Sequence, residues 1–386
     1  MQTILSFFMA IIMFLVPSAN LPKAQVDPET WNTNYSFVFV HGLGGWGEYS
    51  PVNAVMPYWG MFGGDMIRYL NARGFDCCAA SVDPGGSAWD RACELYAQLT
   101  GTRVDYGAAH AERCHHKRFG RDYTGRALLD SFSAQDKINL LGHSFGGATI
   151  LMFTQLMAAG DQAELAAAND ASDLFKGGKG DWIYSITTLS APMNGTTAYT
   201  LRHEFQDGTR KPTMIQDLTS HAIGLAGGNK KDGRMAEDSA EFDMTIDNAR
   251  AMLAGIETLP HVYYFSVPSC CTMDDGNGNQ VRDPSVKVEP LVLSTIDAMG
   301  AYTGVTPAGF VIDDSWKAND GLVNTVSARA PYNAPQQDYD PASVSPGVWN
   351  VMPTYRGDHQ ALMGDLIHIN YIRPFYLDIL VMINGL

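Results

Sequence analysis

Basic residues are scarce in this chain. Its 386 residues include 26 Lys and Arg against 41 Asp and Glu, which gives a formal net charge of −15. A chain of this charge is repelled by polyanions, so the balance argues against nucleic acid or an anionic membrane surface as the main partner. Charged residues make up only 17% and apolar residues 46%, which excludes wholesale disorder and allows a sizeable core.

Long apolar runs are also lacking, with one short exception near the start. Residues 4–16 carry no charge, but a run of this length is too short to cross a bilayer. It suits the hydrophobic part of a secretory signal, and Ser18 and Ala19 offer small residues for cleavage, although no Lys or Arg precedes the run. We therefore predict a signal peptide over residues 1–19, secretion, and no stable membrane insertion after cleavage; a retained anchor is the alternative.

Cysteines are few. Four of the six form adjacent pairs, Cys77 with Cys78 and Cys270 with Cys271, and their spacing does not select a disulfide pairing. A core of the size that this composition allows does not need disulfides for stability.

The chain alternates between apolar strands and helical segments, without internal repeats. Residues 66–82 and 137–160 carry a helix and a strand each, and residues 88–99 have the spacing of an amphipathic helix. Further strands are expected within 35–45, 181–192 and 261–269. This alternation predicts one α/β domain over residues 30–386, with a mostly parallel sheet and helices on both faces.

Residues 198–240 interrupt this order. The segment is polar, Gly-rich and poorly periodic. A long segment of this kind inside a compact domain is more often a functional cover than a plain connector, so we interpret it as a lid.

The pentapeptide GHSFG, residues 142–146, follows an apolar strand and precedes a helix. This is the context of the G-x-S-x-G nucleophile elbow, in which a strained turn projects the serine above the sheet edge. The following helix directs its positive end at the serine, where negative charge develops in acyl transfer. Ser144 is therefore the candidate nucleophile.

A second glycine-rich turn, VHGLGGWG, ends the strand within residues 35–45. It has the HG-x-G form whose backbone N–H donates to the oxyanion, together with the amide that follows the nucleophile. The predicted oxyanion donors are therefore the amides of Leu43 and Phe145.

A serine nucleophile needs a base, and in this architecture the acid and then the histidine follow it along the chain. The downstream histidines are His203, His221, His261, His359 and His368. His359 lies in a loop before the final helix and is the predicted base, with His368 as the runner-up. For the acid, Asp313, Asp314 and Asp320 are available; Asp320 is preferred because Asn-Asp-Gly forms a sharp turn.

One further cluster has no place in this scheme. Residues 107–116, GAAHAERCHH, hold three histidines and a cysteine. These residues alone do not distinguish a metal site from crowding on a solvated turn, because a metal needs partners from elsewhere in the chain.

The sequence from about Ser36 onward resembles the bacterial thermoalkalophilic lipases, secreted α/β-hydrolases with a zinc site. The most specific similarity covers residues 87–121, the zinc-binding insertion of that family. Further matches are LSAPMNGTT at 189–197, IDDSWKANDGLVNTVS at 312–327 and TYRGDH at 354–359. The resemblance implies an α/β-hydrolase fold and supports Asp320 and His359 as partners of Ser144.

The resemblance also implies zinc ligands at Asp90, His110, His116 and Asp243. Four protein ligands that fill a tetrahedral site make a zinc ion structural. Histidines six residues apart point to different sides of a regular helix, so an irregular loop must bring them together. Cys114 and His115 remain alternative ligands.

The sequence departs from the family in three places. Gly142 and Phe145 replace the usual Ala and Gln of the elbow, and the lid segment looks shorter. The family's calcium loop, rich in carboxylates, follows the catalytic histidine, whereas here Gln360 and Ala361 come first and only Asp365 remains nearby. This last departure weakens the expectation of calcium.

The leading hypothesis is a secreted serine lipase that hydrolyses acylglycerol esters at an interface through an acyl-enzyme. A polyester hydrolase or a short-chain carboxylesterase would use the same Ser-His-Asp triad on other esters. A non-enzymatic alternative is an inactive, exported zinc-binding module.

Overall fold

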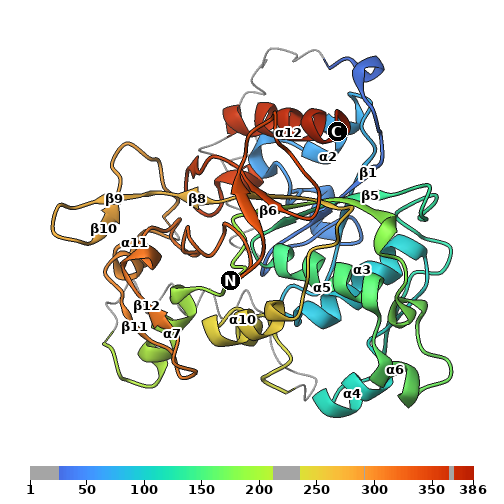
Figure 1. The fold of residues 1–386 in the computed structure, drawn as a ribbon, viewed down its shortest axis with the longest axis horizontal. Coiled ribbons are helices and arrows are strands. Elements are labelled where there is room, and N and C mark those ends of the chain that lie inside the picture. The colour runs from blue at the N-terminus through green and yellow to red at the C-terminus, as the bar shows by residue number, and fades with distance from the viewer. Residues whose placement is uncertain (1–25, 212–234, 291, 365–368) are drawn as a thin grey trace.

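A seven-stranded sheet forms the centre of the fold in the part of the chain that the structure describes (Figure 1). The computed structural model describes residues 26–211, 235–290, 292–364 and 369–386. All neighbouring strands of the sheet pair in parallel. In spatial order they are β13 (Gln336–Asp338), β14 (Trp349–Val351), β7 (Tyr263–Val267), β6 (Ile183–Leu189), β5 (Ile138–His143), β1 (Ser36–Val40) and β2 (Cys77–Ala80). The predicted parallel sheet is confirmed.

Helices cover both faces of this sheet, with α2 and α12 on one face and α3 and α5 on the other (Figure 1). Their bounds are α2 (Met66–Asn71), α3 (Ala88–Thr100), α4 (Ala108–Cys114), α5 (Phe145–Ala159), α6 (Gln162–Ala167), α7 (Thr197–Gln206), α9 (Ala240–Asp243), α10 (Ile246–Ala254), α11 (Leu293–Gly300) and α12 (Ile369–Asn384). The helices expected within residues 66–82, 88–99 and 137–160 are confirmed.

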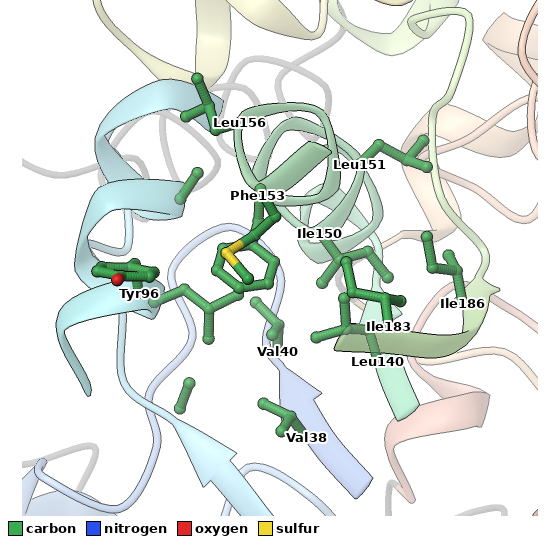
Figure 2. Packing of buried hydrophobic residues seen from close by; sticks show 14 of the residues in the cluster. Val38, Val40, Tyr96, Leu140, Ile150, Leu151, Phe153, Leu156, Ile183 and Ile186 are labelled. Carbon is green, nitrogen blue, oxygen red and sulfur yellow. The ribbon is translucent and has the colours of Figure 1, made fainter. Parts of the chain in front are cut away.

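The strands alternate their side chains between the two layers. In β1, Val38 and Val40 belong to one core cluster, whereas Phe37 and Phe39 belong to the other. This is the period of two that a strand with both faces buried requires. Figure 2 shows Phe153 of α5 packed close to Val40 on the first of these faces.

Among the described residues, four two-stranded sheets lie outside the main sheet. They are formed by β3 (Arg103–Asp105) with β4 (Phe119–Asp122), β15 (Tyr355–Arg356) with β8 (Ser269–Cys270), β10 (Gln280–Arg282) with β9 (Thr272–Asp274), and β11 (Gly304–Val305) with β12 (Val311–Ile312). Within the described ranges, no helix is both long and apolar enough to cross a membrane.

Several predictions of the sequence analysis are not tested by this structure. The signal peptide at residues 1–19 and the histidines His221 and His368 lie outside the described residues, as does Asp365, the carboxylate relevant to calcium. The lid interpretation of residues 198–240 also stays a prediction, because only the ends of that segment are described.

The first turn of helix α5 packs directly against the backbone of the sheet. A Cβ atom added to Gly146 would lie 2.2 Å from the carbonyl oxygen of Val40 on β1. No side chain fits that distance, so the contact between α5 and the sheet requires glycine at this position.

Replacing Gly146 by Ala should therefore destabilise the chain by about 1–3 kcal/mol, because the backbone of β1 or α5 must shift to admit the methyl group. Chemical denaturation of the purified variant measures the loss. Gly255→Ala is the matched control, since that glycine has φ −90° and a Cβ there would meet nothing within 4 Å. Equal stability of the two variants would contradict the close packing described here.

Candidate active site and metal cluster

Ser144 sits in a strained turn at the carboxyl end of β5. Its backbone has φ 54° and ψ −129°, and its amide donates to the carbonyl oxygen of Leu189 at 2.8 Å. Helix α5 begins at the next residue, Phe145. A non-glycine residue rarely adopts positive φ, and the cost is about 1–3 kcal/mol where it does. The flanking elements therefore hold Ser144 in the conformation of a nucleophile elbow.

His359 and Asp320 lie next to Ser144 in the fold. His359 Nε2 is 2.8 Å from Ser144 Oγ, and His359 Nδ1 is 2.9 Å from Asp320 Oδ2. The carboxylate is an obligate acceptor when ionised, so Nδ1 carries the proton and Nε2 faces the serine hydroxyl as an acceptor. The structure brings together the three side chains that the sequence analysis singled out, although 215 residues separate the serine from the histidine.

The carboxylate of Asp320 is itself held in place. Its Oδ1 accepts from the backbone amides of Leu322 and Val323 at 3.0 and 2.7 Å, and the amide of His359 donates to its backbone carbonyl at 2.9 Å. The Asn-Asp-Gly turn thus satisfies one carboxylate oxygen and presents the other to the imidazole.

The rival candidates that the structure describes lie elsewhere. Asp313 caps a short 3₁₀ helix through the amide of Ser315, and Asp314 pairs with Lys317 at 2.8 Å. His203 lies 3.4 Å from Glu241, and His261 is exposed just before β7.

The turn at residues 41–45 packs against the elbow. A Cβ on Gly42 would lie 2.7 Å from the Cβ of Ser144. The buried guanidinium of Arg91 donates to the carbonyl oxygen of His41. Leu43 lines the same pocket as Ser144. The roles of the Leu43 and Phe145 amides as oxyanion donors stay a prediction.

A mainly apolar pocket of about 310 Å³ opens over Ser144 and His359. Its volume lies at the lower end of the range for small-molecule sites. The start of the 198–240 segment reaches it, because Tyr199 and Arg202 of α7 line its wall. Arg202 also pairs with Glu241 of α9. The apolar lining comprises Leu43, Trp46, Met61, Ala198, Tyr199, Met244, Leu322, Val323 and Met363.

A separate cluster joins Asp90, His110, His116 and Asp238. One ligand atom from each lies within 4.8 Å of the others, and all four side chains are nearly buried. His110 Nε2 is 3.1 Å from Asp90 and 3.5 Å from Asp238, while His116 Nε2 is 3.7 and 3.4 Å from the same carboxylates. This arrangement could hold a metal ion.

The two histidines converge as expected, because the helix between them ends. Helix α4 stops at Cys114, and His115 adopts the left-handed conformation with φ 59° before the chain reaches His116. His115 is exposed, and neither it nor Cys114 belongs to the set of four. The ring of Trp89 stacks on His110 at 5.1 Å.

The fourth member of the cluster corrects the sequence analysis, which expected Asp243. Asp243 lies outside the set, and its Oδ2 instead accepts from the amide of Ala88 at 2.7 Å. It therefore occupies the amino end of α3, where a carboxylate satisfies an unpaired helical N–H. Burial raises the pKa of Asp243 to about 7. Asp238 lies just before α9 and Asp243 is its last residue, so only the path of the chain distinguishes them.

The donor chemistry of the cluster suits a divalent cation. Two neutral imidazoles and two carboxylates balance a double charge with the nitrogen and oxygen ligands that zinc accepts. His116 Nδ1 lies 2.9 Å from the carbonyl oxygen of Lys117, which directs the Nε2 lone pair into the cluster. At His110, Arg113 lies 2.9 Å from Nδ1 and would have to turn away on binding, because Nδ1 then carries the proton.

Three comparisons place the chain among known proteins. Residues 33–215 match the family model described as the lipase-like C-terminal domain. The lipase of Staphylococcus hyicus is 31% identical over 378 residues, which cover 89% of this chain and 56% of that protein. Among solved structures, EstA from Clostridium botulinum has a TM-score of 0.80 at 29% identity, covering 97% of this chain and 94% of that one.

Lipase 1 of Pelosinus fermentans has a TM-score of 0.72 at 29% identity, and the match covers 90% of this chain and 98% of that one. The chain is thus similar to bacterial lipases over most of its own length. The resemblance noted from its motifs and the expected α/β-hydrolase fold are thereby confirmed. The chain spans about half the length of the staphylococcal lipases that it matches.

Helix α3 carries one more carboxyl with a displaced pKa, that of the half-buried Glu94. The carboxyl of Glu94 accepts from the hydroxyl of Tyr106 at 2.7 Å and from the amide of Asp83. Burial, with a smaller contribution from the charge of Asp83, raises the pKa of Glu94 from 4.5 to about 8. Between these two values the folded chain holds a proton that the unfolded chain has lost.

The free energy of unfolding should therefore fall by as much as a few kcal/mol as the pH rises from about 4.5 to about 8, and level off above that. Glu94→Gln should flatten this part of the profile and leave the variant more stable than the parent chain near pH 8. Denaturation across this pH range measures the effect, with the exposed Glu257→Gln as the control. Parallel profiles for the parent and Glu94→Gln would contradict the assignment.

Proposed function

We propose that this chain hydrolyses carboxylic esters through a covalent acyl-enzyme. The observation that carries the proposal is the continuous contact from Asp320 through His359 to Ser144, at 2.9 and 2.8 Å. A serine hydroxyl becomes a useful nucleophile only when a positioned base removes its proton. The contact of His359 Nε2 with Ser144 Oγ and of His359 Nδ1 with the buried carboxylate of Asp320 supports this role for the histidine.

In the first half of the reaction, Ser144 Oγ attacks the ester carbonyl and passes its proton to His359 Nε2. Asp320 stabilises the imidazolium that forms, and His359 then gives the proton to the leaving alcohol. A water molecule activated by the same histidine releases the acid in the second half. The tetrahedral oxyanion is held by the amides of Leu43 and Phe145, and α5 directs its positive end to the same place.

The substrate class proposed here is acylglycerols, met at a lipid–water interface by a secreted protein. The apolar lining of the pocket supports this class, because an acyl chain gains by leaving water while the ester reaches Ser144. The kinship with bacterial lipases supports it as well. Short soluble esters and polyesters present the same bond to the same triad, so they are compared directly in the test.

We further propose that the metal cluster holds zinc in a structural role. The four ligand residues do not line the pocket, so the cation would not polarise the ester. It would instead connect α3, α4 and the residues before α9, and its binding free energy would add to folding. Calcium has no assigned site in this proposal.

Ser144→Ala and His359→Ala should each lower kcat on p-nitrophenyl esters by about four orders of magnitude, because each removes a part that acts only together with the others. Asp320→Asn should lose a similar factor. Asp313→Asn, which touches only a local turn, should stay within about twofold of the parent. Turnover close to normal in Ser144→Ala would refute the mechanism.

The same parent protein is then compared on long-chain triglyceride emulsions, soluble short-chain esters and polyester films. The proposal expects the highest specific release from the emulsions. Preference for soluble short esters would make the chain an esterase, and preference for films a polyester hydrolase. Failure of folded parent protein to react with a fluorophosphonate would favour an inactive zinc-binding module.

Zinc analysis distinguishes the two aspartates near α9. Purified parent protein should contain about one zinc per chain, and chelation should lower its melting temperature. Asp238→Asn should weaken zinc binding by more than about 100-fold, since it removes a ligand and not merely a supporting contact. Asp243→Asn should keep its zinc, because an amide oxygen still accepts from Ala88. The opposite result for this pair would contradict the proposed ligand set.

A further inference from the structure

A buried chain of hydrogen bonds runs from the turn at residues 41–45 to the backbone of His359. The amide of Gly42 donates to the hydroxyl oxygen of Tyr58 at 3.1 Å. That hydroxyl lies 2.7 Å from His143 Nδ1, and His143 Nε2 lies 2.9 Å from the carbonyl oxygen of His359. Tyr58 is 4% exposed and His143 1%.

The chemistry of the groups fixes the direction of every proton in this chain. The carbonyl oxygen of His359 can only accept, so His143 Nε2 carries a hydrogen. A neutral imidazole has one N–H, which leaves Nδ1 as an acceptor, and the hydroxyl of Tyr58 must donate to it. The oxygen of Tyr58 then accepts from Gly42. No member can reverse without leaving a buried group unpaired, which is costly.

Burial keeps the two side chains in these forms. It lowers the pKa of His143 to about 3, with a smaller contribution from the charge on His359. It also raises the pKa of Tyr58 above its usual range. Both groups are therefore uncharged at neutral pH. A neutral His143 matters because its ring centroid lies 5.0 Å from that of His359, where a second positive charge would oppose proton transfer.

This series of hydrogen bonds connects three parts of the proposed active site. Gly42 precedes Leu43, the proposed oxyanion donor. His143 precedes Ser144, and the third contact is the main chain of His359 itself. The sequence positions of these parts are far apart, so their relative placement depends on tertiary contacts such as these.

We propose that Tyr58 and His143 are positioning residues that hold the oxyanion turn, the nucleophile elbow and the base at their reactive separation. The inference rests on the proposed ester hydrolysis. Neither side chain exchanges a proton with the substrate, because the hydroxyl proton of Tyr58 is committed to His143. Their contribution is to the geometry of the transition state, in which small displacements of reacting groups are costly.

Tyr58→Phe removes the hydroxyl and keeps the ring. We expect kcat on a soluble p-nitrophenyl ester, per active site titrated with a fluorophosphonate, to fall by about 10- to 100-fold. KM should change by no more than about twofold. The affinity for a trifluoromethyl ketone, which forms a tetrahedral adduct with a serine, should fall by the same factor as kcat. A merely structural role would reduce the titratable fraction and leave the affinity of the remaining sites unchanged.

Tyr264→Phe is the matched control. Tyr264 is also buried, at 2% exposure, and its hydroxyl also accepts from a backbone amide, that of Leu259, at 2.9 Å. It does not line the pocket, so its kcat and inhibitor affinity should equal those of the parent.

The two histidine variants keep the inference testable if Tyr58→Phe does not fold. His143→Gln retains an N–H donor for the carbonyl of His359 and should lose less activity than His143→Leu. The kcat of the double variant Tyr58→Phe with His143→Leu should be no lower than that of the worse single variant, because both substitutions interrupt the same series of hydrogen bonds. Equal losses of kcat in His143→Gln and His143→Leu would overturn the inference, as would fully additive losses in the double variant.

Failure of this inference is distinguishable from failure of the proposed function. If the parent protein hydrolyses the ester and Tyr58→Phe matches it in kcat and inhibitor affinity, the positioning role is refuted and the triad stands. If the parent itself neither hydrolyses esters nor reacts with the fluorophosphonate, the mechanism fails, and the positioning role fails with it.

Discussion

The hydrogen bond between Ser144 and His359 forms only if the fold brings two distant residues together in one geometry. The serine must stand on a strained turn, and the histidine must arrive from a loop far along the chain. The parallel sheet satisfies the first demand, because the carboxyl end of central β5 leads directly into α5. Buried contacts satisfy the second, since Asp320 binds His359 through both its side chain and its backbone carbonyl.

Helix α3 connects the candidate active site with the metal cluster. Asp90 and Arg91 are neighbours on α3. Asp90 belongs to the cluster, and Arg91 donates to the carbonyl oxygen of His41 in the turn at residues 41–45. Asp243, which lies outside the cluster, caps the amino end of the same helix. A zinc ion bound as proposed would therefore stabilise the helix that supports the turn at residues 41–45, although its four ligand residues do not line the pocket. A structural cation can in this way affect catalysis without touching the substrate.

The sequence predicted those features that local patterns encode. Alternating apolar segments indicated the parallel sheet, and G-x-S-x-G in its strand–helix context indicated Ser144. Features that depend on the path of the chain were harder to predict. Asp238 and Asp243 have the same chemistry and nearly the same position, so only tertiary structure shows which one reaches the histidines. Tyr58 carries no local signal at all, because its partners Gly42 and His143 lie on other elements.

The central claim is that Ser144 is the nucleophile of this site. It is tested most directly by reacting the intact, zinc-loaded protein with a fluorophosphonate and locating the adduct by peptide mass spectrometry. The account predicts one adduct per chain on the peptide that contains Ser144, with labelling lost when His359 is replaced by Ala. An adduct on another residue, or a folded protein that forms none, would contradict it.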